Sequence, residues 1–175
     1  MDDEPDADLL RRFVQGDVDA FECLFSQFQV EVYQWVLRIV RDPNDAEEGV
    51  VEAFWRAYRA RGRFDASRSF GAWMRRIATN VARDRLRDAR RRGRLTTCEV
   101  PACITSNHDV DRALTAAFRK LPVKLQVVAT LALIEDQPYA EIGDSLDLPV
   151  GTVKSRLFRA IRALRVELAR MGIRP

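Results

Sequence analysis

Residues 139–157 read YAEIGDSLDLPVGTVKSRL, and no other stretch of the chain has so distinct a local pattern. An amphipathic segment over about residues 138–145 is followed by a turn at residues 146–149 and by a second helical segment from Val150. This length and composition are typical of a helix-turn-helix, in which a short support helix fixes the angle of a recognition helix. The predicted fold is therefore all-α, with a helix-turn-helix in its C-terminal part.

The predicted helix over residues 150–170 has an apolar side and a basic side. At 100° per residue, five apolar positions cluster and are expected to face the core: Val153, Leu157, Ala160, Ile161 and Leu164. Hydrogen-bond donors lie opposite or beside them, and the candidate DNA contacts are Thr152, Lys154, Ser155, Arg156, Arg159 and Arg162. A solvated basic helix in a bundle would show a similar charge run. The turn spacing, and the absence of acids between Pro149 and Val166, favour DNA contact.

Outward from this motif, helical periodicity continues through most of the chain, without convincing alternation of apolar and polar residues. Further helices are predicted over about residues 8–15, 17–39, 42–60, 69–92, 109–120 and 122–134. Asp17 and Asp42 are typical N-terminal caps, and Pro43 suits the first helical position. Gly, Thr, Pro and Ser gather over residues 93–107 among few large apolar residues, as in a linker. The predicted organisation is two small helical domains, residues 1–92 and 109–175, joined by a flexible linker over residues 93–108.

The predicted helix over residues 69–92 also has two sides. A polar stripe runs along it at i, i+4, i+7 and i+11, namely Arg76, Asn80, Arg83 and Arg87. The arginines of such a stripe can hold a nucleic-acid backbone while Asn80 reads a base edge. The full candidate set on this helix is Arg75, Arg76, Thr79, Asn80, Arg83 and Arg87. Phe70 and Trp73 lie on the apolar side, which favours core packing over stacking on unpaired bases.

The predicted helix over residues 42–60 is acidic in its first half. Asp45 and Glu47 lie where the dipole of a helix N-terminus favours acids. Glu48 and Glu52, together with Val51, lie further in and are less well explained by the dipole. We expect this part of the helix to avoid nucleic acid and to bind a basic protein surface.

Charge is distributed in alternating blocks along the 175 residues, although the total is only +3. The net charge is −8 over residues 1–60, +9 over 61–97, −4 over 98–148 and +6 over 149–175. Two basic blocks separated by acidic ones predict a polyanion held at two places. Of the 29 bases, 26 are Arg, which forks onto phosphate and onto guanine edges. Arg-rich helices from a GC-rich genome are the alternative explanation of the charge alone.

The composition argues against several classes of protein. An apolar fraction of 47% with 8 Gly and 7 Pro is unlike a disordered or fibrous chain, and no apolar run approaches the ~20 residues that span a bilayer. One His leaves little material for a catalytic triad or a metal site, and three Cys make a poor disulfide framework. The acidic start, MDDE, is unlike a signal peptide. We expect a cytoplasmic protein that is not an enzyme, holds no cofactor or metal and does not insert into a membrane.

The cysteines leave one alternative open. Cys98, Cys103 and His108 are evenly spaced in the predicted linker, which is compatible with a metal or redox switch. A structural zinc site needs four ligands, so plain reduced cysteines are the default interpretation. Cys23 is far away in a predicted helix and is expected to pack as a small apolar residue.

Two sets of motifs resemble the extracytoplasmic-function sigma factors, a family of bacterial RNA polymerase sigma factors. The segments that look like region two of this family are DAEEGVVEAF at residues 45–54, RFD at 63–65 and FGAWMRRIATN at 70–80. The segments that look like region four are LP at residues 121–122, YAEI at 139–142 and GTVKSRL at 151–157. Many response regulators end in a similar helix-turn-helix, but both sets in this order within one chain are strongly specific. The resemblance covers nearly the whole chain.

The resemblance implies a dissociable subunit that binds core RNA polymerase and directs promoter-specific initiation. In this family the acidic helix binds the clamp helices of the largest subunit, here through Glu48, Val51 and Glu52. Region two also recognises and melts the −10 element, here with the loop near residues 65–69 and the candidate set on the helix over residues 69–92. Region four reads the −35 element, here with the helix near residues 150–164, and docks on the polymerase flap. The implied partners are core polymerase, promoter DNA and an anti-sigma factor.

Three departures from the family pattern bear on these partners. The family usually has Gln where this chain has Val51 and a large aliphatic residue where it has Gly49, both on the presumed clamp-binding helix. Residues 123–127, VKLQV, are less polar than is usual, which favours a partner surface for an anti-sigma protein. The alternative function is a two-domain helix-turn-helix regulator that binds duplex DNA without acting as a polymerase subunit. Such a regulator should offer a ligand pocket or a phosphoacceptor in its N-terminal half.

Overall fold

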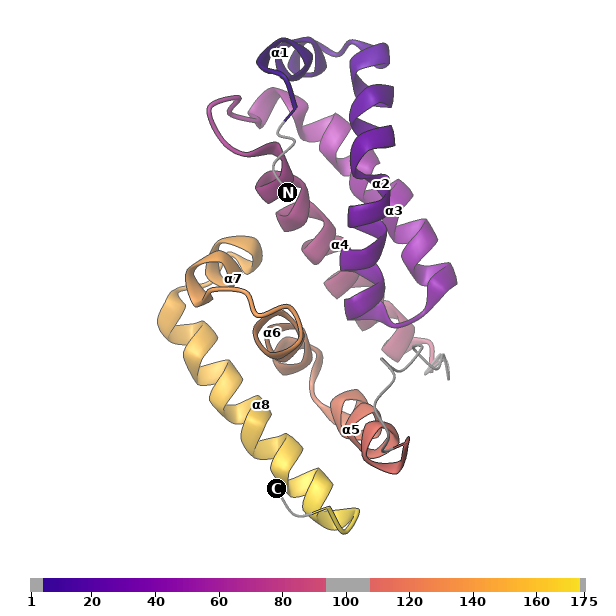
Figure 1. Cartoon of the computed structure of the whole chain (residues 1–175), viewed down its shortest axis with the longest axis vertical. Coiled ribbons are helices and arrows are strands. Elements are labelled where there is room, and N and C mark those ends of the chain that lie inside the picture. The colour runs from indigo at the N-terminus through magenta and orange to yellow at the C-terminus, as the bar shows by residue number, and fades with distance from the viewer. Residues whose placement is uncertain (1–4, 94–107, 174–175) are drawn as a thin grey trace. The chain divides into compact units, whose positions relative to one another are not determined.

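The computed structural model describes residues 5–93 and 108–173, and within these ranges every regular element is a helix. The chain divides into two compact units, residues 1–96 and 97–175. The first unit contains α1 (Ala7–Gln15), α2 (Val18–Val40), α3 (Pro43–Ala60), the 3₁₀ turn η1 (Arg61–Arg63) and α4 (Phe70–Arg91). The second contains α5 (His108–Lys120), α6 (Val123–Leu133), α7 (Tyr139–Leu146) and α8 (Val150–Arg170), as Figure 1 shows. The predicted all-α class with two helical domains is confirmed.

The helices of the first unit begin where short polar side chains cap their backbones. The Asp17 carboxylate accepts from the backbone N–H groups of Asp19 and Ala20 at 2.9 and 3.2 Å, at the start of α2. The Asp42 carboxylate accepts from the Asp45 N–H at 3.0 Å, before the proline that opens α3. Such bonds satisfy donors that have no partner within the helix, which is why the sequence alone located these starts.

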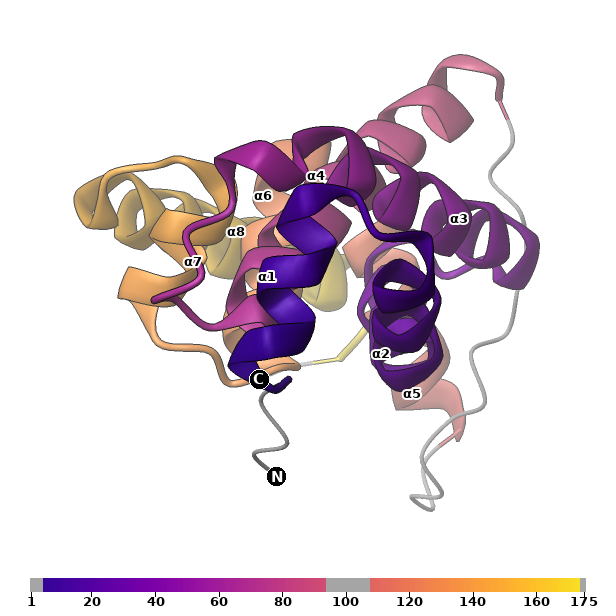
Figure 2. The same cartoon turned by 90° about the horizontal axis from the view of Figure 1, so that it is seen from above.

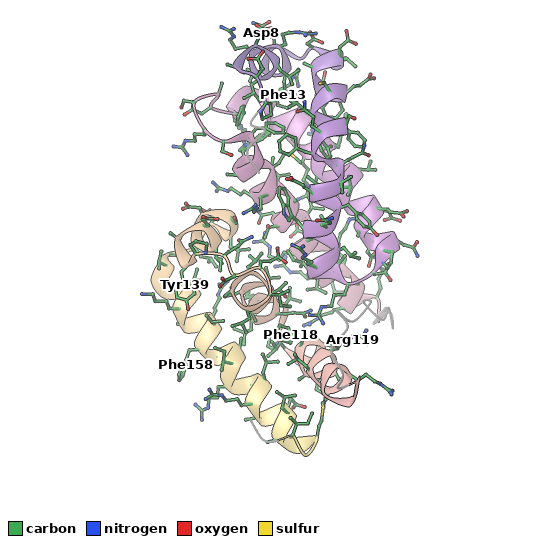
Figure 3. All side chains as sticks on the ribbon, in the orientation of Figure 1. Asp8, Phe13, Phe118, Arg119, Tyr139 and Phe158 are labelled. Carbon is green, nitrogen blue, oxygen red and sulfur yellow. The ribbon has the colours of Figure 1, made fainter. Side chains whose placement is uncertain are left out.

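The core of the first unit lies between α2, α3 and α4, and α1 crosses one end of this bundle (Figures 1 and 2). Rings from α1, α2 and α4 meet there: the Phe70 centroid is 5.7 Å from that of Phe13 and 5.1 Å from that of Phe28. Figure 3 shows Phe13 beneath α1, directed into the bundle. Phe70 is 1% exposed and Trp73 is half-buried at 4.9 Å from the ring of Phe64, so the predicted core packing of both rings is confirmed.

One expectation about the first unit is wrong. Cys23 lies exposed on α2 instead of packing as an apolar residue. Gly49 is buried, and a Cβ there would lie 2.7 Å from Cγ1 of Val36, because α2 and α3 approach closely at this point. Gly49 is therefore a packing residue and does not alter the exposed surface of α3.

The second unit is built on α8, against which α5, α6 and α7 pack. Its core includes Phe118 from α5, Ala129 from α6, and Ala160 and Leu164 from α8. An ion pair of 2.7 Å between Lys120 Nζ and Glu167 Oε2 also joins α5 to α8. These contacts fix α8, the predicted recognition helix, along most of its length.

The turn between α7 and α8 is tight. The N–H of Leu148 donates to the carbonyl of Gly143 at 2.8 Å, and Asp147 adopts the left-handed region with φ of 56°. A Cβ at position 143 would lie 2.7 Å from the carbonyl oxygen of Leu148, so this position needs Gly. Pro149 precedes α8 and its carbonyl accepts from the N–H groups of Thr152 and Val153. The predicted helix-turn-helix is confirmed.

Candidate nucleic-acid and protein interfaces

The basic side of α8 is exposed, as the sequence predicts. Lys154, Ser155, Arg159 and Arg162 are exposed, and Thr152 and Arg156 are half-buried. Four of the five predicted core positions are buried (Val153, Leu157, Ala160 and Leu164), while Ile161 is half-buried. Within the helix, the Arg159 Nε–H donates to the Ser155 carbonyl at 3.2 Å, and the Ser155 hydroxyl donates to the Thr152 carbonyl at 3.0 Å. Guanidinium, ammonium and hydroxyl groups therefore share one exposed side of α8.

Phe158 also lies on this side of α8, and the sequence analysis did not single it out. Its exposed fraction is 69%, the largest of any large apolar residue among those described, and Figure 3 shows the ring projecting from α8. Its spacing in the sequence indicates this position, because residue 158 is three positions after Ser155 and four before Arg162 and so lies on the same side of the helix. An exposed ring on a basic helix adds an apolar contact of the kind that thymine methyl groups accept.

The polar side of α4 is less uniform than predicted. Arg76 and Arg87 are exposed, whereas Asn80 and Arg83 are half-buried. The Asn80 amide donates to the Arg76 carbonyl at 3.0 Å. Thr79 is only 1% exposed, so it does not contribute to the exposed part of this side.

Arg75 also differs from the rest of its predicted set. Its guanidinium carbon lies 4.8 Å from the centroid of the Trp35 ring on α2, in cation–π geometry. Arg75 is half-buried and contributes to the packing of α4 on α2. The exposed surface of α4 that we call the α4 face is therefore carried by Arg76, Asn80, Arg83 and Arg87.

The loop before α4 is held by a local hydrogen-bond network. One carboxylate oxygen of Asp65 accepts from the N–H and from the hydroxyl of Ser67, at 3.0 and 2.7 Å. These two bonds hold the pKa of the Asp65 carboxyl below its ordinary value. The Ser69 hydroxyl then accepts from the Ala72 N–H at 3.2 Å and caps α4. The loop therefore enters the start of α4 with a fixed local geometry.

The acidic side of α3 combines carboxylates with large apolar groups. The Glu48 side chain is 70% exposed, Val51 is 65% exposed, and Glu52 is half-buried. Trp55, one turn beyond Val51, is 57% exposed, and the sequence analysis did not include it. Its position at i+4 from Val51 and i+7 from Glu48 was the available signal. We call these four residues the α3 face.

Arginines from within the first unit hold both carboxylates of the α3 face. Arg85 on α4 places Nη1 at 2.7 Å from Glu48 Oε2 and Nη2 at 3.2 Å from Glu52 Oε2. Arg56 contacts Glu52 and also places Nη1 at 3.1 Å from Asp84 Oδ2 on α4. Partial burial lowers the pKa of the Arg56 guanidinium, but the hydrogen bonds that it donates to Asp84 and Glu52 outweigh the burial and leave this pKa above its ordinary value. The carboxylates thus also bind α3 to α4.

The described residues contain neither a cluster of metal ligands nor a helix that could span a membrane. No group of three or more His, Cys, Asp or Glu side chains is placed to hold a metal ion among them. In the same part of the chain, none of the helices has the length and apolar character that a membrane span requires. Cys98 and Cys103 lie outside the described residues, as does the side chain of His108, and so does the predicted switch.

The chain is similar to known proteins along most of its length. Residues 24–92 match the model of Sigma-70 region 2, and residues 111–164 match that of Sigma-70 region 4. The ECF RNA polymerase sigma factor SigW of Bacillus subtilis is 33% identical over 176 residues, which cover 91% of this chain and 94% of that protein. The ECF RNA polymerase sigma-E factor of Escherichia coli K12 is 32% identical over 173 residues, which cover 89% and 90% of the two chains.

Two solved structures resemble the fold. The structure of CnrH in complex with the cytosolic domain of CnrY has a TM-score of 0.64 at 26% identity, and covers 94% of this chain and 97% of that one. The sigma factor RpoE of Bartonella quintana, solved in complex with the anti-sigma factor NepR, has a TM-score of 0.59 at 20% identity over 85% and 96% of the two chains. The second likeness shows the fold alone.

Proposed function

The chain belongs to the extracytoplasmic-function (ECF) family of RNA polymerase sigma factors, and from that membership we propose which of its surfaces binds which partner. It is a sigma factor: it binds core RNA polymerase and directs promoter-specific initiation. The alternative of a helix-turn-helix regulator that acts apart from polymerase is set aside, because the N-terminal half matches Sigma-70 region 2. We further infer that the chain catalyses no reaction itself and acts in the cytoplasm, where core polymerase is found.

The exposed side of α8 is proposed to read the −35 element. A helix that follows a tight turn and presents Lys154, Arg159 and Arg162 outward fits the major groove and its phosphates. The half-buried Thr152 and Arg156 lie beside them, and Ser155 completes the set predicted from the sequence. Phe158 is proposed to contact a thymine methyl group in the same groove.

The α4 face is proposed to hold the −10 element. Arg76 and Arg87 are exposed and suit phosphates, while the amide of Asn80 suits a base edge. The loop at residues 65–69 leads into the start of α4, which Ser69 caps. This loop is proposed to receive a base extruded from the duplex, because unstacking a base costs only about a few kcal/mol. Thr79 and Arg75 are omitted from the proposed contacts because one is buried and the other packs on Trp35.

The α3 face is proposed to bind the clamp helices of the largest polymerase subunit. Glu48 supplies exposed negative charge, and Val51 and Trp55 supply apolar area of the kind that dominates protein interfaces. The presence of Val51 where the family has Gln makes this contact more apolar than is usual. Docking of the second unit on the polymerase flap is part of the same proposal.

An anti-sigma factor is proposed as the regulatory partner. CnrH, which is 26% identical over nearly the whole chain, was solved with the cytosolic domain of another protein bound. The segment over residues 123–127 does not expose the apolar surface that the sequence suggested, because Val127 is buried and Leu125 is half-buried. The proposal therefore does not depend on that segment.

The single observation that carries this function is the pairing of a region 2 match with a region 4 match in one chain, each with an exposed polar face. Run-off transcription tests it: the purified chain is added to sigma-free core polymerase on a library of genomic promoter fragments. We expect transcripts that start at defined sites and that require the chain. Absence of any such transcript, with the core shown to be active with another sigma factor, would contradict the proposal.

A further inference from the structure

A continuous chain of ion pairs connects the α3 face to the α4 face. It starts at Glu48, passes through Arg85 to Glu52, and continues through Arg56 to Asp84. Asp84 then contacts two arginines of the α4 face, with Oδ1 at 3.6 Å from Arg83 Nη2 and at 3.9 Å from Arg87 Nη1. The Asp84 carboxylate therefore contacts both Arg56, on the helix proposed to bind polymerase, and two proposed DNA contacts on α4.

The contacts of Asp84 are unequal. Arg56 Nη1 donates to Oδ2 at 3.1 Å, which is a hydrogen-bonded ion pair. Arg83 and Arg87 approach Oδ1 at 3.6 and 3.9 Å, beyond hydrogen-bond distance. The carboxylate is thus held by the arginine of α3 and only loosely contacted by the two arginines of α4.

We propose that Arg56 is a positioning residue for the contact between the α4 face and promoter DNA, an inference that rests on the function proposed above. By holding Asp84, Arg56 keeps this carboxylate from pairing fully with Arg83 and Arg87, so that both guanidinium groups remain available to phosphates. Without Arg56, the Asp84 side chain, which is 35% exposed, competes with phosphate for both arginines and repels it.

The geometry requires arginine at position 56. Its two terminal nitrogens reach different carboxylates, Nη2 that of Glu52 and Nη1 that of Asp84, and so span α3 and α4. A lysine ammonium is a point charge and lacks this fixed fork. Glu52 retains Arg85 as a second partner, so the main loss on removing Arg56 falls on Asp84.

A purely structural bridge between α3 and α4 makes a different prediction. If Arg56 and Asp84 only hold the two helices together, removing either partner weakens the fold and DNA binding alike. In the proposal, removing Arg56 lowers DNA affinity, whereas removing the charge of Asp84 frees Arg83 and Arg87 and does not lower it. The two single variants thus distinguish a bridge from a positioning residue.

The experiment compares holoenzymes made with wild type, Arg56→Gln, Asp84→Asn and the double variant, on the promoter fragment that gives the strongest run-off transcript. Arg11→Gln serves as the charge-matched control, because it breaks an exposed ion pair of α1 with Asp8. Promoter affinity is measured over a range of salt concentrations. Affinity for core polymerase and the melting temperature of each free chain are measured alongside.

We expect Arg56→Gln to weaken promoter binding about fivefold and to reduce the slope of log affinity against log salt by about one unit. Asp84→Asn and the double variant should bind at least as tightly as wild type, and Arg11→Gln should match it. Weaker binding by Asp84→Asn, or wild-type binding and slope for Arg56→Gln, overturns the proposal. Because wild-type holoenzyme must first form a promoter complex, failure of the proposed function appears separately in that sample.

Discussion

Arg159 is a proposed contact to the −35 element whose guanidinium is exposed. It is exposed on α8, and its Nε–H donates to the Ser155 carbonyl at 3.2 Å, which leaves the terminal nitrogens of the guanidinium for a ligand. We expect Arg159→Ala to weaken binding to the −35 element about tenfold or more, because a good side-chain contact to a base or phosphate contributes about 1–3 kcal/mol. Association with core polymerase should be unchanged.

The matched control for Arg159 is Arg170→Ala in the last turn of the same helix. Arg170 pairs with Glu167 at 2.7 Å, so its guanidinium already has a partner within the chain. The affinity of each variant holoenzyme for a duplex that carries only the upstream element is measured, and only Arg159→Ala should lower it. Equal loss of DNA binding and of core binding in Arg159→Ala would contradict the division of roles between the two units.

Trp55 is the residue of the α3 face that sequence reasoning missed. Its indole is 57% exposed and stacks on Tyr58, with the ring centroids 6.4 Å apart. Exposed tryptophans at interfaces often contribute about 2 kcal/mol or more, so we expect Trp55→Ala to weaken binding to core polymerase about 30-fold. Val30→Ala on α2, where the side chain is 61% exposed, is the control for loss of exposed apolar area. A core affinity for Trp55→Ala equal to that of Val30→Ala would exclude Trp55 from the interface.

The turn between α7 and α8 leaves no room for a side chain at Gly143. A Cβ at Gly143 would lie 2.7 Å from the Leu148 carbonyl oxygen, whereas a Cβ at Gly151 would meet nothing within 4 Å. Overpacking of this kind costs about 1–3 kcal/mol, so we expect Gly143→Ala to lower the free energy of unfolding by that amount. Gly151→Ala, within α8, should raise it by about 0.5–1 kcal/mol. Urea denaturation of both variants measures the difference, and equal effects would show that the turn tolerates a side chain.

The start of α2 gives the fold a dependence on pH. The hydrogen bond from Arg12 at 2.8 Å, followed by those from the Ala20 and Asp19 backbones, holds the pKa of the Asp17 carboxyl below its ordinary value. A lowered pKa in the folded state means that this stabilisation is present above pH of about 4 and is lost as the pH falls through the lowered value. Melting temperatures of wild type should therefore fall more steeply below pH 4 than those of Asp17→Asn. Parallel curves for the two chains would remove Asp17 as a source of the dependence.

Local sequence patterns predicted where the helices begin. Contacts between residues distant in sequence determine which side chains on each helix are exposed or paired, and the patterns did not predict these. Asp17 and Asp42 indicate the starts of α2 and α3 in the sequence, because each carboxylate caps a backbone N–H only two or three residues away. The pairing of Arg85 with Glu48 joins residues 37 positions apart, and no periodicity in the sequence predicts it. Cys23 lies at a helix position that apolar spacing leaves ambiguous, and its exposure was decided by how α2 packs.

The charge blocks along the sequence correspond to separate surfaces of the two units. The acidic first block includes the α3 face, the basic second block includes the α4 face, and the basic last block includes the exposed side of α8. The sequence predicted which helices carry these surfaces, because a helix of known bounds places residues on its sides by geometry alone. It did not predict that Thr79 is buried, or that Asp84 is bound by Arg56 and lies only loosely against two proposed DNA contacts.

In the proposed function, one chain directs polymerase to a promoter through two basic surfaces and helps to open the DNA at one of them. This function is tested by nuclease protection combined with permanganate reactivity of unpaired thymines, on a promoter fragment with core polymerase, with and without the chain. We expect protection of an upstream duplex element together with reactive thymines further downstream, both only when chain and core are present. Protection of a single duplex segment by the chain alone, with no reactive thymine when core is added, would contradict it.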